Sequence, residues 1–316
     1  MMSSNKEKNY YGEKNCSIIY NNKNGVMVSC KNKSYFEHSE TGELLCGVHS
    51  KKYKKMVKDL KKRDKGDAQR ILLEKYRDED TLIESFRVEN ETNGKKGTVV
   101  LSRLQMMHAP DDIAGYRKVF PNFKHGPRKD GLGMPSLSPM SLGPVEHGQP
   151  VVPVSLNIEN FHQGSKCFQK DLESDGKTVG KTYEESRNKM FQDSEPHRHK
   201  YKDGKGKPLL PLFFVWIDSK SKQHYLNALQ CRQFYCNFYE RLVSQQDDFK
   251  KLQQLKNSGV NLQIIGYDAR PVKPDDILLE YQNTKLPFGH ELVLATMLWF
   301  DDPQQYPWRK FKTFDF

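Results

Sequence analysis

The sequence predicts an α+β fold, in which helices surround a mixed β-sheet and a small cysteine-containing module precedes it. Two apolar runs of strand length lie at 208–217 and 259–266, and the segment between them, 225–249, has the apolar periodicity of a helix. Strands and helices in this order bury their apolar faces against one another. Three N-terminal cysteines fall in short segments with turn signals, which indicates a separate small module.

The chain is long enough for two domains and a sizeable core. It has 316 residues, of which 36% are hydrophobic, and its mean hydropathy is −0.83. No apolar run reaches the roughly 18 residues of a membrane-spanning helix, and the first residues lack the apolar core of a secretory signal. We therefore expect an intracellular protein of the cytoplasm, the nucleus or a virion, without a membrane partner. Its cysteines are then reduced or metal-bound rather than disulfide-bonded.

Composition shifts along the chain predict four successive regions. A turn-rich stretch at 90–97 separates a Lys-rich N-terminal part from a more apolar C-terminal part. A second stretch, 119–145, is rich in Pro, Gly and Ser but also carries large apolar residues, so we expect an ordered loop on the core. The expected regions are a disordered tail at 1–15, a metal-binding module at 16–50, a basic helical linker at 51–95 and an α+β domain at 96–316.

The N-terminal cysteines have a histidine close to the last of them. Cys16, Cys30 and Cys46 are followed by His49, and strand-like runs flank the turn between the first two. Thiolates and an imidazole suit tetrahedral zinc, and a module this small needs a metal to fold. The pattern predicts a structural zinc site; the alternative is three buried cysteines and a surface histidine.

The charge favours polyanionic partners. The chain has a net charge of +11 and a pI near 9.1, and residues 51–65 carry nine Lys or Arg against two Asp. Apolar Tyr53, Met56, Val57 and Leu60 share one face of this segment, which predicts a basic amphipathic helix. Nucleic acid is the first partner that such a helix would fit. The alternative is a solvated, Lys-rich surface.

The C-terminal region offers its own strands and helices. Residues 98–101 and 208–217 read as strands, the second central and buried. Cys231 and Cys236, five residues apart on the helix expected at 225–249, are predicted to be core residues. The strand at 259–266 runs directly into Asp268, and the C-terminal end of a buried strand is a usual position for ligand binding.

Residues 157–168 carry the most informative pattern. If this segment is helical, Glu159, Gln163 and Lys166 share one face as a carboxylate, a carboxamide and an amine. These groups can handle a sugar or a nucleobase. The alternative is an ordinary amphipathic helix whose charged side chains are solvated.

The sequence of this segment, ENFHQGSKCF, resembles the signature E-H-Y-x-Q-x-x-K-x-F of the NADAR family. The matching residues are Glu159, Phe161, Gln163, Lys166 and Phe168, and family members carry His where this chain has Asn160. The family consists of N-glycosidases that hydrolyse the bond between a nitrogen and C1′ of a ribose, in riboflavin-pathway intermediates or in ADP-ribose adducts of guanine. The other motifs are similar to those of a divergent branch in large DNA viruses and phages. The resemblance implies a NADAR-like mixed sheet with surrounding helices over 96–316.

The resemblance also implies site residues. Glu159 or Asp268 would stabilise an oxocarbenium-like C1′ or activate water, and Lys166 would protonate the leaving nitrogen, contact a phosphate or attack C1′. The segment at 287–291 resembles the Gly-rich stretch before the last NADAR helix, and the N–H groups of such a helix end favour anions. The expected ligand contacts are Asn160, Phe161, Gln163, His197, Arg198, His199, Tyr267, Phe288, Gly289 and His290, and Phe161, Phe288 or Tyr267 would stack on the base.

The segment 196–200 contains two His, an Arg and a Lys, which favours contact with phosphates. His197 and His199 would also share a face in a strand and hold a metal, and the plain alternative is a basic surface loop.

The leading functional hypothesis is an N-glycosidase-like hydrolase that acts on a nucleotide or ADP-ribose-type ligand. The alternatives are a non-catalytic, zinc-containing nucleic-acid-binding or virion protein, and a module that binds ADP-ribose without cleaving it.

Overall fold

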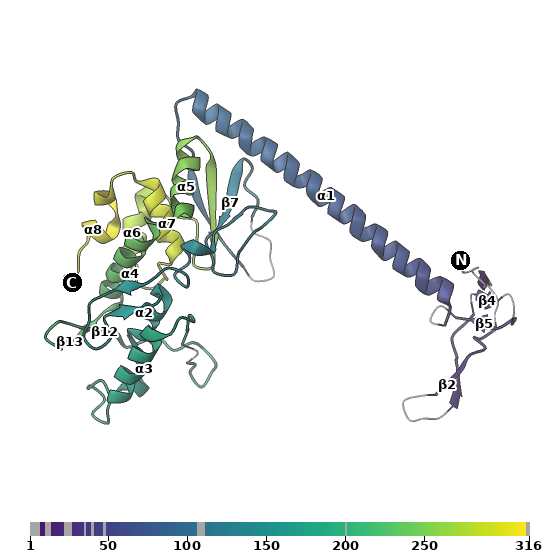
Figure 1. Ribbon diagram of the computed structural model, residues 1–316, viewed down its shortest axis with the longest axis horizontal. Helices are drawn as coiled ribbons and strands as arrows, with labels where there is room; N and C mark the ends of the chain where they lie inside the picture. The colour runs from purple at the N-terminus through teal and green to yellow at the C-terminus, as the bar shows by residue number, and fades with distance from the viewer. Residues whose placement is uncertain are drawn as a thin grey trace. The chain divides into compact units, whose positions relative to one another are not determined.

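The computed structural model describes residues 7–9, 14–21, 27–34, 36–38, 41–46, 49–105, 111–199 and 201–313 (Figure 1). The chain divides into two compact units, Met1–Arg77 and Asp78–Phe316. The boundary falls inside the helix α1 (Lys51–Thr92). The described part of the chain is a mixed α/β protein with eight α-helices and several sheets, which is consistent with the predicted α+β class.

The N-terminal unit is built from short antiparallel strands. β1 (Glu7–Asn9), β4 (Phe36–His38) and β5 (Leu44–Leu45) form one sheet, and β2 (Ile19–Asn21) pairs with β3 (Met27–Ser29) as the predicted hairpin. Most of the predicted disordered tail, 1–15, lies outside the described residues. Within it, β1 is a paired strand, so the prediction of disorder is wrong for those three residues.

The basic segment is helical, as its periodicity predicts. α1 runs without interruption through Gly66, so the basic helix expected at 51–65 continues through most of the expected linker as one helix of 42 residues. It ends before Gly94, whose φ of +64° reverses the chain and needs no strain in a glycine. The side chain of Asn90 then donates a hydrogen bond of 2.8 Å to the carbonyl of Gly259, which ties the C-terminal end of the helix to the C-terminal unit.

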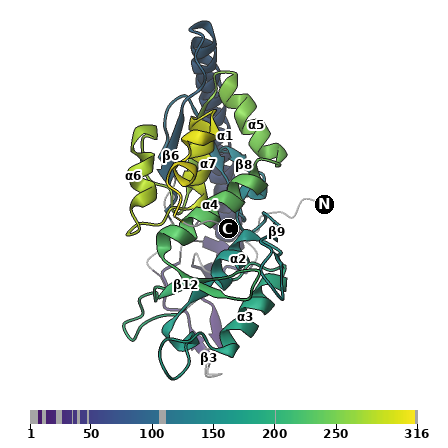
Figure 2. The same ribbon diagram turned by 90° about the vertical axis from the view of Figure 1, so that its left-hand side faces the viewer.

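A four-stranded parallel sheet lies at the centre of the C-terminal unit. Its order is β6 (Val99–Arg103), β14 (Asn261–Gly266), β7 (Tyr116–Phe120) and β8 (Leu132–Gly133). β14 is buried at every residue, as expected for a strand that is covered on both faces. α7 (His290–Trp299) packs against β6 and β14 and is buried from Glu291 to Leu298, while α5 (Asp247–Asn257) also packs against β14 (Figure 2).

The sequence predicts one mixed sheet, but the C-terminal unit has a second, antiparallel sheet in addition to the parallel one. β12 (Phe213–Ile217) is its middle strand, between β11 (Lys166–Cys167) and β13 (Gln223–Leu226). The apolar run at 208–217 is therefore only partly a buried strand. Leu210 is 84% exposed, because the Pro-rich half of the run precedes the strand as an exposed segment.

The long helix expected at 225–249 is two helices. α4 (Ala228–Val243) begins at a capping box made by Asn227 and Gln230, and it ends before Ser244. α5 starts again with Asp247 and Asp248 in its first turn, where carboxylates favour a new helix N-terminus. Cys231 and Cys236 are buried in the core, as predicted.

The other elements connect these layers. None of the helices in the described part of the chain is both long and apolar enough to cross a membrane. The remaining elements are the ribbon of β9 (Val145–Glu146) and β10 (Val154–Ser155), the helices α2 (Ile158–Gly164), α3 (Lys181–Gln192), α6 (Ile277–Gln282) and α8 (Pro307–Lys310), and 3-10 turns at Pro135–Leu137, Gln169–Asp171, Pro274–Asp276 and Pro303–Gln305.

Candidate functional site

The short helix α2 carries the carboxylate at the centre of the site. Asn157 caps this helix by accepting a hydrogen bond of 2.7 Å from the backbone N–H of Asn160. Glu159 lies in the first turn and is 6% exposed. The helix ends at Gly164, where any side chain would collide with the ring of Phe191. Lys166 is therefore on β11, and the prediction that one helix face carries all three polar groups is wrong.

Hydrogen bonds nevertheless bring these groups together. Gln163 donates through Nε2 to Glu159 Oε1 at 3.0 Å, and Lys166 Nζ donates to Gln163 Oε1 at 3.1 Å. Arg198 Nε donates to the same Glu159 oxygen at 2.9 Å. We call Glu159, Gln163, Lys166 and Arg198 the α2 cluster. Gln163 links a carboxylate to an amine, so both charges stay within reach of one ligand.

The surroundings of Lys166 lower the pKa of its amine. Burial lowers the pKa of its amine, and the nearby Arg198 acts in the same direction, while Cys231, Glu159 and Asp268 oppose the shift. A lowered pKa increases the share of free amine at neutral pH, and free amine is the nucleophilic form. Asp268, the second predicted carboxylate, is among the groups that act electrostatically on Lys166.

Asn160 has a structural role rather than the predicted role in ligand binding. It is fully buried, and its Nδ2 donates to the carbonyls of Asp193 and Glu195 at 2.9 and 2.8 Å. Its Oδ1 accepts a bond of 2.7 Å from the backbone N–H of His197. These bonds hold the loop after α3 and so place Arg198 on Glu159. The sequence marks Asn160 only as the position where the NADAR signature has His, and spacing alone does not show which loop its carboxamide holds.

The two histidines of this loop face different partners. His197 Nε2 is 2.7 Å from Asp193 Oδ2, and the His197 ring is partly exposed. His199 Nε2 donates to the carbonyl of Gln163 at 2.9 Å, and burial lowers the pKa of its ring. They do not share a metal, and neither belongs to a metal-ligand group in the described residues. Arg198 and Lys166 are the cations of the site that remain available for phosphates.

The second half of the site lies at the end of β14 and the start of α7. Asp268 follows β14, as the sequence predicts, and the loop that contains Gly289 runs beside it. A Cβ at Gly289 would lie 2.6 Å from Glu291 Oε2 and 3.0 Å from Asp268 Oδ2, so only glycine fits between the two carboxyl groups. The gap that Gly289 leaves thus brings Asp268 and Glu291 together.

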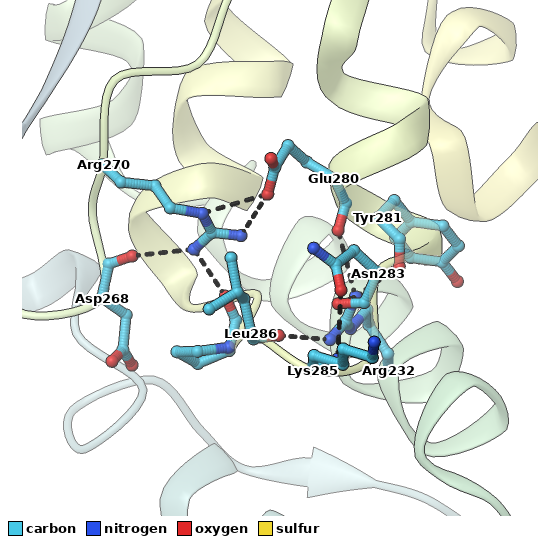
Figure 3. Close-up of polar contacts among 9 residues, drawn as sticks. Arg232, Asp268, Arg270, Glu280, Tyr281, Asn283, Lys285 and Leu286 are labelled. Atoms are coloured by element: carbon cyan, nitrogen blue, oxygen red, sulfur yellow. Dashed lines mark hydrogen bonds and ion pairs between the residues drawn. The ribbon is translucent and has the colours of Figure 1, made fainter.

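Two arginines fix the position of this loop (Figure 3). Arg270 donates to Glu280, to the carbonyl of Pro287 at 2.8 Å and to that of Asp268 at 3.3 Å. Arg232 donates to the carbonyls of Glu280, Tyr281, Asn283 and Leu286. In Figure 3 the carboxylate of Asp268 is turned away from the guanidinium of Arg270, which contacts the backbone carbonyl of Asp268 instead.

Tyr235 lies on α4, which packs against both α2 and α7. Burial raises the pKa of its phenol, and Tyr239, Glu159 and Glu291 add to this shift. Burial also raises the pKa of Asp268; Glu291 raises it further, against the effects of His290, Arg198 and Arg270. The sequence indicates only that Tyr235 belongs to the apolar stripe of a helix. Its electrostatic interaction with Glu159 and Glu291 depends on the packing of α4 against α2 and α7, which the sequence does not show.

The predicted stacking residues divide into core and surface. Phe161 is fully buried, with the rings of His147, Phe191, Phe234 and Phe238 at centroid distances of 4.9 to 5.6 Å. Phe288 is 6% exposed and packs edge-on against Tyr281. Both are core residues, and the prediction that they stack on a ligand base is wrong. Tyr267 is 49% exposed and keeps a ring that can stack.

Cys16, Cys30, Cys46 and His49 form a cluster that can hold a metal. All four ligand atoms lie within 4.8 Å of one another, and the three cysteines are buried. The His49 Nδ1 atom is 3.3 Å from Cys16 Sγ and 3.4 Å from Cys46 Sγ, and Cys30 Sγ is 3.8 Å from Cys46 Sγ. None of the six cysteines is in a disulfide. The predicted ligand set is thus assembled in the N-terminal unit.

Comparison of the chain with protein family models, with curated proteins and with solved structures gave no match.

Replacement of Asn160 tests how Arg198 is placed. Asn160→Ala removes three buried hydrogen bonds to the loop, at roughly 1 kcal/mol of stability each. We expect faster amide hydrogen exchange at 193–199 and a lower free energy of unfolding, measured by mass spectrometry and by denaturant titration. The control is Asn257→Ala, at an exposed residue at the end of α5, which should change neither. Unchanged exchange at 193–199 in Asn160→Ala would contradict this role.

Proposed function

We propose that the C-terminal unit hydrolyses the N-glycosidic bond of a ribose, in a nucleotide or in an ADP-ribose adduct of guanine. The observation that carries this proposal is the hydrogen-bonded series of Glu159, Gln163 and Lys166. It supplies a buried carboxylate and an amine of lowered pKa around one carboxamide. The NADAR-like signature names the same three residues, and the class of substrate comes from that resemblance.

Each group has a role in such a reaction. Cleavage of the bond leaves positive charge on C1′, which the Glu159 carboxylate stabilises. Lys166 contacts C1′ or a phosphate of the ligand, and Tyr267 offers a ring for the base. The Arg198 side chain is 65% exposed while that of Glu159 is 8% exposed, so Arg198 can move away to a phosphate and free the carboxylate.

We further propose that the N-terminal unit is a zinc module that binds nucleic acid. Tetrahedral zinc with Zn–S bonds of about 2.3 Å and Zn–N bonds of about 2.0 Å requires edges of about 3.8 Å between sulfurs and about 3.6 Å between sulfur and nitrogen. The observed separations of 3.8 Å for Cys30–Cys46 and 3.3 and 3.4 Å for the two contacts of His49 fit this geometry. The basic stretch 51–65 directly follows the cluster and supplies the charge for phosphates.

One observation favours a non-catalytic alternative. Glu159 Oε1 already accepts hydrogen bonds from both Gln163 and Arg198, which is the arrangement of a satisfied, structural ion pair. In that case the C-terminal unit binds a nucleotide or ADP-ribose without cleaving it, or stabilises a nucleic-acid-binding or virion protein. Turnover separates this alternative from the hydrolase.

The turnover experiment uses DNA that carries ADP-ribosylated guanine. We expect the wild-type protein to release ADP-ribose, and Glu159→Gln and Lys166→Ala to lower the rate at least about 100-fold because each removes a charged group from the reacting centre. Released ADP-ribose is measured by mass spectrometry. The matched controls, Glu146→Gln and Lys177→Ala, alter exposed residues away from the α2 cluster and should keep the wild-type rate. Full activity in Glu159→Gln would remove that residue from the mechanism.

The metal experiment addresses the N-terminal unit. Elemental analysis of the purified protein should give one zinc per chain, and Cys46→Ser should lose it because the site then has three ligands. Cys167→Ser, a buried cysteine outside the cluster, should retain the zinc. The zinc-free protein should also bind DNA more weakly in low salt, as measured by fluorescence anisotropy. A protein that carries no zinc at all would rule out this assignment.

A further inference from the structure

Glu291 is a buried carboxyl group to which the proposed reaction assigns no role. It lies in the first turn of α7 and is 1% exposed. In the described part of the chain its Oε2 has no hydrogen-bond partner, although His290 Nδ1 is 3.3 Å away without hydrogen-bond geometry. His290 Nε2 donates to the carbonyl of Pro121 at 2.8 Å, so the neutral ring has no proton on Nδ1. A buried carboxylate oxygen without a donor is costly when charged.

Two glycines, Gly266 and Gly289, leave the space in which the carboxyl groups of Glu291 and Asp268 lie close together. A Cβ at Gly266 would lie 1.9 Å from Glu291 Oε1, and a Cβ at Gly289 would lie within 3.0 Å of both Glu291 Oε2 and Asp268 Oδ2. The missing side chains thus create the space that the two carboxyl groups occupy. Asp268 is exposed to solvent, whereas Glu291 is buried in the protein interior.

The cationic side chains nearby do not compensate the charges of both Asp268 and Glu291. Among the described residues Glu291 has no Lys or Arg partner within ion-pair distance, and Arg270 is engaged by Glu280 at 2.5 Å. The titratable and charged groups that act on Asp268 or Glu291 come from every neighbouring element: Lys166 of β11, Arg198 of the loop after α3, Tyr235 and Tyr239 of α4, Arg270 after β14 and His290 of α7. Two carboxyl groups this close, one of them buried, resist ionising together.

We propose that Asp268 and Glu291 share one proton at neutral pH, and that Asp268 donates it to the leaving nitrogen while Glu291, a positioning residue, keeps it there. The raised pKa of Asp268 has Glu291 among its causes and supports this assignment. The proposal rests on the proposed glycosidase function for the donation step, whereas the shared proton is a property of the protein alone.

In this reaction each bond that breaks is matched by one that forms. The bond between C1′ and nitrogen breaks with its electron pair on nitrogen, and nitrogen takes the proton of the pair. The oxygen of a water molecule bonds to C1′, and one of its protons returns to the pair of carboxyl groups. Glu159 remains ionised and stabilises the cation throughout. Proton donation and stabilisation of the cation are thus assigned to different carboxyl groups, Asp268 and Glu159, whose environments differ.

Carbon-13 NMR of the carboxyl groups tests the shared proton directly. The Asp268 signal is identified by its loss in Asp268→Asn. In the wild-type protein we expect Asp268 to titrate above the ordinary range of an aspartate, and in Glu291→Gln its midpoint should fall by about one pH unit or more. Glu146→Gln, which alters an exposed carboxyl group, should leave the midpoint unchanged.

Three results would overturn the shared proton. They are an ordinary Asp268 midpoint in the wild-type protein, a midpoint that Glu291→Gln does not lower, and a doubly protonated His290 at pH 7 by nitrogen-15 NMR. If Glu291→Gln does not fold, the Glu291 signal is followed in Asp268→Asn, where its midpoint should fall instead.

A failure of the proposed function gives a different result. A pair that titrates as expected in a protein that releases no ADP-ribose would reject the glycosidase and leave the shared proton in place. Where turnover is present, Glu291→Gln should move the alkaline limb of the rate profile to lower pH, because Asp268 then loses its proton earlier. An unchanged profile would reject donation by Asp268.

Discussion

Glu159 carries a negative charge into the interior, and the segments around it are arranged to compensate that charge. A buried carboxylate without donors would cost several kcal/mol. Gln163 and Arg198 each donate to its Oε1. Arg198 reaches this oxygen because Asn160, the next residue of α2, holds the loop after α3 through three hydrogen bonds. Two adjacent residues thus supply both the charge and the placement of its partner.

Local sequence pattern predicted which polar residues meet, but not the elements that bring them together. The spacing of Glu159, Gln163 and Lys166 indicated proximity, and the strand before Asp268 indicated a strand-end site, both from short-range rules. The end of α2 at Gly164 depends on the ring of Phe191, which is distant in sequence. For the same reason the sequence assigned Tyr235 only to an apolar helix stripe. It placed Glu291 at a helix start from which a ligand could be reached, but it did not indicate that Glu291 lies close to Asp268.

The carboxyl groups of the site occupy contrasting environments. Glu159 accepts hydrogen bonds from an arginine and an amide, whereas Asp268 and Glu291 face each other across the space left by Gly289. Such a difference is what a reaction with one charged and one protonated carboxyl group requires. The N-terminal unit is separate from this site: its three cysteines and one histidine are placed so that they could hold a metal, and the basic stretch 51–65 follows them.

The central claim is that the α2 cluster and Asp268 surround a ribose rather than only stabilise the fold. A crystal structure of the protein with ADP-ribose tests it most directly. The account predicts that C1′ of the ribose lies against Glu159 and Lys166 with Asp268 beside it, and that Arg198 has left Glu159 for a phosphate. A ligand bound elsewhere, or no bound ligand at saturating concentration with the pair of Arg198 and Glu159 intact, would contradict it.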